Sequence, residues 1–423
     1  MKYYRSLLLQ NGVDVIKMRS TDECQSTAVF QNSYADKMKI KKIAILGQSS
    51  RGGGSETFLR SILPCLATSA PAFEIHLFIP ASRQHFYSCL PDNVRVYHVE
   101  DSVLDSPLRR LIYENYELIK MLRKIKPDVC LVNSEIFSPF LACLKKPVII
   151  IYHAAIHFYF YKGMNESKIK LFYIRIMRNI AIKKARRVVA VSHFERGEIG
   201  GRYPKYMMDK ILVIYHGIDH SSFNKDVLIS AKSQNQLFDS PYILSVGDRH
   251  GHKQIEEMID IYHKMRTDYS TEEHLVLVGR PKSEKIETSI QNKIKRYSLE
   301  KYVHLVDYVN NDDIKNYYLN ASLYWTNSQH ESFGLTPLEA MATGIPVLAV
   351  WRAALPEVCG DAALFYDPVA DRSKKAEIAA NFVKDVELRR KYKEKGLEHV
   401  KDFNWEKCAK SYLDLLTREI EAR

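Results

Sequence analysis

One stretch, residues 322–350, constrains the fold of this chain more than any other part. Its sequence is SLYWTNSQHESFGLTPLEAMATGIPVLAV, in which an apolar run is followed by a polar loop, a short helical segment and a second apolar run. Thr336 can cap the helix, Pro337 suits its first position and Gly344 suits its end. Two buried strands joined by a helix are typical of a parallel sheet, and the loop then lies at the carboxyl edge, where ligands bind.

Two carboxylates, Glu331 and Glu339, flank this loop. The free N–H groups of the predicted helix start point toward it, and such a place attracts anions. One carboxylate also suits a vicinal diol, because its two oxygens can accept both hydroxyl hydrogens. A structural alternative stays open for each residue. Thr336 and Glu339 fit a capping box, which needs no ligand, and Glu331 could be a solvated loop acid.

Apolar runs alternate with helical patterns along most of the chain. In the first half we expect strands at residues 42–47, 74–79, 94–98, 128–133, 147–152, 187–192 and 211–215. In the second half, strands are expected up to Gly247 and at 274–279 and 303–307. Runs such as PVIIIY and RVVAVS suit strands that are buried on both faces. A chain of 423 residues with this alternation predicts two α/β domains.

A glycine-rich loop, QSSRGGGSE, follows the first expected strand and precedes a helix from about Glu56 to Ala67, with Ser55 as a candidate cap. A strand, a glycine turn and a helix start together make an anion site. The glycine spacing is not that of the dinucleotide-binding fingerprint, and the next strand ends in Pro80 without an acidic residue for a ribose. A nicotinamide enzyme is therefore disfavoured, and a plain glycine turn is the alternative.

Three more polar side chains follow expected strands. His153 comes directly after PVIIIY, and Arg249 and Lys253 lie in the loop after Gly247. Two fixed cations at a strand end suit a diphosphate, whose charge grows as the bond to it breaks. A hydrogen-bonded loop histidine and a solvated pair of cations are the alternatives.

Positive charge is concentrated in the first half of the chain. The net charge is +12, of which residues 1–210 carry +15 and residues 211–423 carry −3. Residues 162–187 combine basic and apolar side chains at helical spacing, which fits either an interfacial helix on anionic lipid or an amphipathic helix packed on the sheet. No nucleic-acid recognition motif accompanies them. An anionic membrane surface is therefore a candidate partner, and nucleic acid is not expected.

The sequence indicates no metal, redox or membrane-spanning element. The seven cysteines form no C-x-x-C pair, and no metal ligand set is evident, so we expect no metal and no other cofactor. No apolar stretch is long enough for a transmembrane helix, and residues 1–38 lack a signal-peptide core. We expect a cytoplasmic protein, for which peripheral attachment to the inner face of the membrane stays an open alternative. Residues 1–38 are a polar extension compatible with disorder.

The pattern ESFGLTPLEAMATGIPV resembles, almost position by position, the two-glutamate signature of retaining glycosyltransferases of the GT-B fold, family-four type. The run Gly53-Gly54-Ser55-Glu56 is similar to the GG-x-E loop of that family. The segment VIYHGID resembles its domain junction, with His216 where Asn is usual, and the tail DFNWEKCAK is similar to its F-x-W helix.

The resemblance covers about residues 40–420 and implies two Rossmann-like domains that face a central cleft. In order along the chain, the expected parts are the N-terminal extension 1–38, an acceptor domain 39–222, a linker 223–240, a nucleotide-sugar donor domain 241–398 and a C-terminal helix 399–423 that returns to the first domain.

The resemblance also implies roles for single residues. Lys253 and Arg249 would stabilise the leaving diphosphate, although Arg249 is displaced from the usual position. Glu331 would orient the donor sugar and offset developing positive charge, with His153 nearby, and Glu339 would hold the ribose. Further contacts with the donor would come from Gly53, Gly54, Phe333, Gly334 and Leu335.

The implied reaction is transfer of a hexose from a UDP- or GDP-linked sugar to a saccharide or lipid-linked acceptor, with retention and without a metal, in surface polysaccharide or glycolipid assembly. Two other classes stay open, because a fold does not fix a function. A sugar-nucleotide epimerase or a phosphorylase can use the same fold, although no lysine site for a pyridoxal cofactor is indicated. A non-catalytic, membrane-associated binding protein is the other class.

Overall fold

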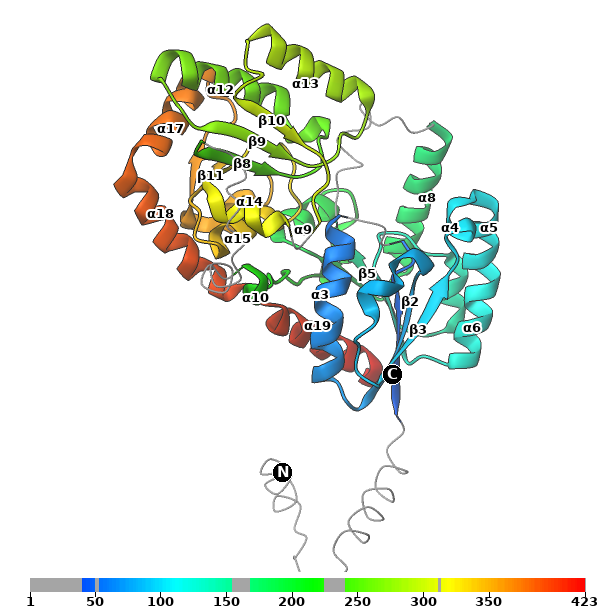
Figure 1. Cartoon of the computed structure of the whole chain (residues 1–423). Helices are drawn as coiled ribbons and strands as arrows, with labels where there is room; N and C mark the ends of the chain where they lie inside the picture. The colour runs from blue at the N-terminus through cyan, green and yellow to red at the C-terminus, as the bar shows by residue number, and fades with distance from the viewer. Residues whose placement is uncertain (1–39, 50–52, 154–167, 224–239, 311–312, 423) are drawn as a thin grey trace, which may run out of the picture. The chain divides into compact units, whose positions relative to one another are not determined.

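The structure is a computed structural model, shown in Figure 1, and it describes residues 40–49, 53–153, 168–223, 240–310 and 313–422. The proposed extension 1–38 and nearly all of the proposed linker 223–240 lie outside the described residues. From Lys42 onward, the chain forms one compact unit.

The first sheet has seven parallel strands in the order β3-β2-β1-β4-β5-β6-β7. Its strands are β1 (Lys41–Leu46), β2 (Phe73–Pro80), β3 (Val94–Val99), β4 (Val129–Val132), β5 (Val148–Tyr152), β6 (Arg187–Ala190) and β7 (Ile211–Val213). Its helices are α3 (Gly54–Ser69), α4 (Asp101–Asp105), α5 (Pro107–Ile112), a π-helical turn (Tyr113–Glu117), α6 (Leu118–Ile125), α8 (Lys168–Lys184) and α9 (His193–Gly200).

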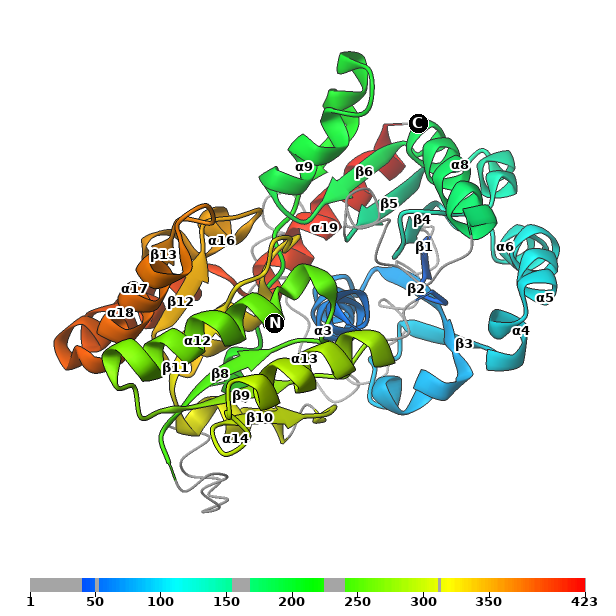
Figure 2. The ribbon, with the colours of Figure 1, turned by 90° about the horizontal axis from the view of Figure 1, so that it is seen from above.

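The second sheet has six parallel strands in the order β10-β9-β8-β11-β12-β13. They are β8 (Tyr242–Val246), β9 (His274–Val278), β10 (Val303–Val306), β11 (Ala321–Thr326), β12 (Val347–Val350) and β13 (Ala363–Tyr366). The helices after β7 are α10 (His220–Phe223), α12 (Ile255–Tyr269), α13 (Glu284–Arg296), α14 (Ile314–Asn320), α15 (Leu335–Ala342), α16 (Leu355–Cys359), α17 (Arg372–Lys384), α18 (Val386–His399) and α19 (Trp405–Glu421). In Figure 2, α12 lies between α13 and α17.

Local sequence explains most of these elements. All five residues of β5 (VIIIY) are buried, which suits a central strand with both faces covered. Side-chain caps begin several helices, among them Ser192 at α9 and Asn404 at α19. The predicted parallel α/β strands are confirmed to within about two residues, as expected for assigned boundaries. The prediction missed β13, a run of only four residues.

Two predicted caps are wrong. The helix α3 begins at Gly54 after Gly53, so Ser55 lies inside the helix. The helix α15 begins at Leu335 after Gly334, so Thr336 also lies inside its helix. In both places a glycine with positive φ (67° at Gly53 and 104° at Gly334) turns the chain into the helix.

The last helix returns to the first sheet, as predicted (Figure 1). Tyr412 of α19 packs on Phe58 of α3, with ring centroids 5.5 Å apart. The buried Glu419 pairs with Arg186 at 2.8 Å and with Arg187 at 2.5 Å. Burial raises the pKa of Glu419, but hydrogen bonds from the two arginines more than offset this, so the net pKa is lowered.

Candidate active site

In both sheets the strand order reverses at one place, and ligands bind at such a switch point in open α/β sheets. The reversal lies between β1 and β4 in the first sheet and between β8 and β11 in the second. The strands β8 and β9 end in Gly247 and Gly279, with φ of 144° and 146°. A Cβ on Gly279 would lie 2.2 Å from the carbonyl oxygen of Gly247. Only glycine therefore allows the chain to pass so closely at this edge.

Lys253 and Glu331 form an ion pair at the second switch point. The Nζ of Lys253 lies 2.5 Å from Oε1 of Glu331, and the side chains are 19% and 17% exposed. Lys253 ends the 3₁₀ turn Gly251–Lys253 after β8, whereas Glu331 lies in the loop after β11. The N–H of Gln329 donates to the carbonyl oxygen of His252 at 2.8 Å and joins the two loops. The structure thus brings together a cation and a carboxylate that are 78 residues apart.

The hydroxyl of Thr336 forms a hydrogen bond within the protein and does not cap α15. The Tyr324 hydroxyl donates to Oγ1 of Thr336 at 2.7 Å. Since no side chain caps α15, its first N–H groups have neither an intrahelical partner nor a side-chain cap. The capping-box alternative for Glu339 is therefore wrong. These N–H groups, from Leu335 onward, lie at the loop that carries Glu331.

Glu339 lines the cleft and accepts a hydrogen bond from the Tyr318 hydroxyl at 2.9 Å. Burial raises the pKa of Glu339 to about 7, although the bond from Tyr318 and the charge of Arg60 lower it. A carboxylate with a pKa near neutrality takes up or releases a proton readily when a ligand arrives.

The cleft beside Glu339 has a volume of about 760 Å³, which is within the range of small-molecule sites. From the second sheet it is lined by Gly247, Gly279 and Leu335, and from the first-sheet side by Arg60, Arg83 and His85, among others. Arg83 lies 3.6 Å from Glu56. No recognised motif includes these three basic residues, so the sequence did not single them out: Arg60 lies on α3 after the glycine loop, and Arg83 and His85 lie on the turn after β2.

Arg249 does not belong to this cleft, which corrects the prediction. It is 1% exposed, and all its N–H donors are used within the protein. Nε and Nη2 donate to Glu287 at 2.8 and 3.0 Å, and Nη2 also reaches Asp307 at 3.3 Å. Nη1 donates to the carbonyl oxygens of Gly279 and of Val306. Its guanidinium ties together the ends of β9 and β10, so no donor is left for a diphosphate.

His153 follows β5 and reaches the first switch point through Asn133, which follows β4. Its Nε2 is 2.6 Å from Oδ1 of Asn133, and Nδ2 of Asn133 donates to the carbonyl oxygen of Ser55 at 2.9 Å. The Asn133 oxygen therefore faces the ring, so Nε2 carries the hydrogen. Burial lowers the pKa of His153 to about 4, so the imidazole is neutral at pH 7. The ring also contacts Phe58, with centroids 5.4 Å apart.

Aromatic rings link the two switch points. His216 lies 5.8 Å from His153 and 5.1 Å from Phe333, centroid to centroid. Phe333 is 4% exposed and also packs against Tyr215 and Phe403, so its side chain supports the loop instead of facing the cleft. His216, the residue that replaces Asn, is thus part of this packing.

Gly53 and Gly54 lie exposed at the start of α3. The N–H groups of Glu56 and Thr57 donate to the carbonyl oxygen of Gly53, at 3.2 and 3.1 Å. A Cβ on Gly54 would meet nothing within 4 Å, so the protein itself does not require glycine there. A substrate that approaches the backbone is a reason for glycine at that position.

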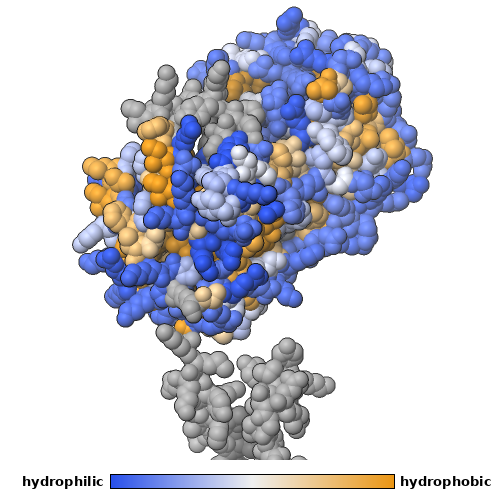
Figure 3. Space-filling model, turned by 180° about the vertical axis from the view of Figure 1, so that it is seen from behind, coloured by the Kyte–Doolittle hydropathy of each residue, from blue (hydrophilic) through white to orange (hydrophobic). Residues whose placement is uncertain are grey.

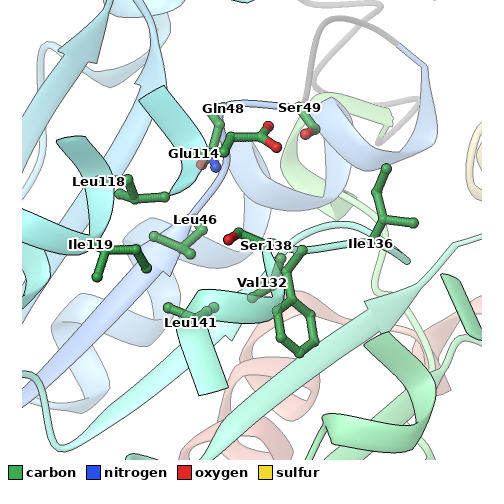
Figure 4. A pocket seen from close by; sticks show the side chains of 11 residues that line it. Leu46, Gln48, Ser49, Glu114, Leu118, Ile119, Val132, Ile136, Ser138 and Leu141 are labelled. Carbon is green, nitrogen blue, oxygen red and sulfur yellow. The ribbon is translucent and has the colours of Figure 1, made fainter. Parts of the chain in front are cut away.

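A second, much smaller cavity lies at the carboxyl ends of β1 and β4 (Figure 4). Gln48, Ser49, Glu114 and Ser138 supply its polar lining, and Arg110 donates to both Ser49 and Glu114. With about 20 Å³, it has room for about one water molecule. Of these two cavities, only the larger cleft has room for a nucleotide sugar.

Within the described residues, no group of three or more His, Cys, Asp or Glu side chains could hold a metal ion. In the same part of the chain, no helix is both long enough and apolar enough to cross a membrane.

Comparison with known families agrees with this geometry. Residues 229–399 match the family model described as glycosyl transferases group 1, and residues 52–222 match the model described as glycosyltransferase family 4. Together the two models cover most of the chain. The chain belongs to the glycosyltransferases that they describe. The region matched by the first model includes Lys253, Glu331 and Glu339. The region matched by the second includes Gly53, Gly54 and His153.

Several bacterial relatives are similar to this glycosyltransferase over part of their length. The O-antigen chain mannosyltransferase B of Escherichia coli is 28% identical over 54% of this chain and 59% of its own. The O-antigen chain mannosyltransferase RfbU of Salmonella typhimurium is 28% identical over 50% of this chain and 56% of its own. The chain therefore matches a little over half the length of these relatives.

Solved glycosyltransferase structures share the fold. The sucrose-phosphate synthase of Thermosynechococcus elongatus has a TM-score of 0.69 at 19% identity and covers 90% of this chain and 100% of its own. Anabaena HepE in complex with UDP-glucose has a TM-score of 0.69 at 16% identity and covers 89% of this chain and 99% of its own. At such identities the likeness shows the fold alone, and the predicted GT-B fold is confirmed.

Proposed function

We propose that this chain transfers a hexose from a UDP- or GDP-linked sugar to a saccharide or lipid-linked acceptor, with retention at the anomeric carbon and without a metal. The observation that carries the proposal is the Lys253–Glu331 pair, which does not line the cleft itself but lies next to it. A Cβ on Gly247, which lines the cleft, would lie 3.2 Å from Nζ of Lys253. The relatives named above are O-antigen mannosyltransferases, so mannose is the first hexose to test and surface polysaccharide is the first acceptor class.

The ion pair would rearrange when the donor binds. A diphosphate carries more negative charge than Glu331 and would attract Nζ of Lys253, as would the N–H groups at the start of α15. Glu331 would then face the sugar, where a carboxylate offsets positive charge at the anomeric carbon. Because the charge on the leaving diphosphate grows during the reaction, these donors stabilise the transition state more than the ground state.

The other residues would bind and orient. Glu339 would accept hydrogen bonds from the ribose hydroxyls, and Gly54 would allow a substrate to approach the start of α3. A neutral His153, whose Nε2–H donates to Asn133, would accept a hydrogen bond at Nδ1 from a sugar hydroxyl and would bring no charge. In this proposal the leaving phosphate accepts the proton of the acceptor hydroxyl, since no described side chain stands out as a general base.

A thermal-shift panel of UDP, GDP, ADP and CMP with their sugars tests the proposal first. A ligand at about 100 times its dissociation constant stabilises a protein by about 2.7 kcal/mol. We expect one nucleoside diphosphate to raise the melting temperature clearly above the others. Donor turnover without an acceptor product would favour an epimerase or a phosphorylase. No shift with any nucleotide would favour the non-catalytic binding protein.

We also propose that the first-sheet half docks on an anionic membrane, through apolar side chains on α5, α8 and the π-helical turn. They are exposed by 41% to 68% and comprise Leu108, Leu111, Ile112, Tyr116, Phe172, Tyr173 and Ile176. Figure 3 shows apolar residues gathered at the left, where α5 and α8 lie. Burial raises the pKa of Tyr173, and Glu114 and Arg110 shift it in opposite directions, so α8 is electrostatically coupled to the π-helical turn and α5.

The charge around this face favours anionic lipid over a neutral surface. Arg109, Arg175, Lys183 and Lys184 are exposed on α5 and α8, and Lys120 is exposed on the neighbouring α6. Each basic residue near an anionic surface contributes about 1 kcal/mol. A lipid-linked acceptor would then lie on the same side as the first switch point.

Cosedimentation with vesicles of phosphatidylglycerol and phosphatidylcholine tests the docking. We expect binding at low salt to be lost in a Leu108→Ser, Ile112→Ser, Phe172→Ser variant. The matched control carries Tyr206→Ser, Val369→Ser and Val386→Ser, which remove equally exposed apolar residues elsewhere. No binding by the intact protein, or equal loss in the control, contradicts the proposal. Arg186 and Arg187 are unsuitable for such a test, because they hold Glu419.

A further inference from the structure

The loop that carries Glu331 is held by side chains of the first-sheet half. Oγ of Ser192 donates to the carbonyl oxygen of Ser332 at 2.6 Å. Oε1 of Glu195 lies 3.3 Å from Nε2 of His330. Ser192 and Glu195 lie at the start of α9, and both are fully buried. The residues immediately before and after Glu331 are therefore both in contact with side chains at the start of α9.

A third side chain fixes α9 from the opposite direction. Glu357 of α16 accepts hydrogen bonds from the N–H groups of His193 at 2.6 Å and Phe194 at 2.8 Å. It also accepts one from the Tyr215 hydroxyl at 2.8 Å. A carboxylate suits this place, because the first N–H groups of a helix lack intrahelical acceptors and attract negative charge.

The same helix α16 reaches the loop itself. The N–H of Ala354, which directly precedes α16, donates to the carbonyl oxygen of Glu331 at 3.1 Å. The loop is thus bound at three consecutive residues, 330 to 332, by α9 and by the start of α16. Glu357 joins these two elements, so the contacts form one connected set.

We propose that Ser192, Glu195 and Glu357 are positioning residues, which hold this loop so that the Glu331 carboxylate faces the site beside Lys253. The proposal rests on the transferase function proposed above. If the two halves separate at this edge, the contacts of Ser192 and Glu195 with the loop are lost together. The loop is then fully held only in the closed arrangement, which also excludes water from a bound donor.

Two variants and one matched control test this inference on the full chain. Ser192→Ala removes the hydroxyl that binds Ser332, although it also removes the cap of α9. Glu357→Gln acts from the other half and leaves that cap intact. The control is Glu198→Gln on the same helix, because the ion pair of Glu198 is a local one, with Arg202 four residues later at 3.0 Å. Ser192→Thr keeps a hydroxyl and is the rescue variant.

Hydrogen exchange measures the hold on the loop without any substrate. We expect the N–H of Ala354 to exchange at least about tenfold faster in Ser192→Ala and in Glu357→Gln than in the wild type. The control and Ser192→Thr should stay within about twofold. Unchanged exchange at Ala354 in both test variants overturns the inference.

Kinetics then separate positioning from donor binding. With GDP-mannose or UDP-glucose, we expect kcat to fall at least about tenfold in both test variants, while the Kd of GDP or UDP changes less than about twofold. A loss of nucleotide affinity that matches the loss of kcat overturns the positioning role. If the wild type neither turns over a donor nor binds a nucleotide, the proposed function fails, whereas the exchange result still decides whether the loop is held.

Discussion

The two switch points differ in charge. At the second sheet, Lys253 and Glu331 form an ion pair, and Nζ of Lys253 lies close to Gly247, which lines the cleft. At the first sheet, His153 is neutral and is bound to the amide of Asn133, next to a glycine loop. A charged edge suits the departure of a diphosphate, whereas a neutral polar edge suits sugar hydroxyls, which carry no charge to balance. We therefore expect substitutions at the second edge to affect bond cleavage, and those at the first edge to affect binding and stability.

The largest expected effect concerns the charged edge. Glu331→Gln or Lys253→Ala should lower kcat by about 10²–10³-fold, because each removes a group that acts on the developing charge. Steady-state transfer and a melting curve measure this, and the melting temperature should change little. Lys282→Ala breaks a nearby exposed ion pair, with Asp248 at 2.7 Å, and is the control. Near-normal transfer in either test variant would remove that residue from the mechanism.

Arg249 shows that charge at this edge also has a structural use. Arg249→Met should lower the free energy of unfolding by about 3–5 kcal/mol, because it leaves Glu287 without its buried partner. Urea denaturation measures the loss, and Arg280→Met, on an exposed arginine one residue after Gly279, is the control. Full stability combined with lost turnover would instead support the diphosphate role that the sequence predicted.

The neutral edge should be visible in the pH dependence of stability. The pKa of His153 is lowered to about 4, so between pH 6.5 and 4 the unfolded chain binds more protons than the folded one. Its contribution is complete above pH 6.5 and is lost as the pH falls toward 4, by about 3 kcal/mol. In His153→Gln, urea midpoints should fall less over this range. An equal fall in both proteins would place the acid sensitivity elsewhere.

The smallest expected effect is on the pH dependence of nucleotide affinity, through the protonation of Glu339. The pKa of Glu339 is raised to about 7, so near neutral pH a fraction of the protein molecules carries a protonated Glu339. In these molecules Glu339 must release its proton before the carboxylate can accept hydrogen bonds from both ribose hydroxyls. Nucleoside diphosphate affinity should therefore fall up to about tenfold per pH unit below pH 7. Calorimetry of Glu339→Gln isolates this part, since the phosphate of the nucleotide titrates equally in both proteins. Parallel pH profiles would exclude Glu339 from the linkage.

Local patterns predicted the strands and placed Lys253 and Glu331 at one edge, because strand order and carboxyl ends follow from apolar runs and glycines. They could not show that Arg249 is buried, since burial depends on Glu287 and on carbonyl groups about 30 to 57 residues away. Nor could they show the hold of Ser192 on Ser332, 140 residues apart. The roles toward a donor stay predictions for Lys253, Glu331, Glu339 and His153, and equally for Gly53, Gly54, Phe333, Gly334 and Leu335.

The return of α19 has a practical consequence for labelling. The chain crosses between the two halves twice, once before β8 and once before α19. The two crossing segments are in contact, because Ile218 and Asn404 form a parallel β-bridge. A Cβ on Gly217 would lie 2.3 Å from the backbone of Asn404, so the crossing segments cannot be spread by a larger residue without distortion. A fluorophore attached after Glu421 would therefore report on the first-sheet half. A second fluorophore on α13 would report on the second-sheet half, and energy transfer between the two would follow the distance between the halves.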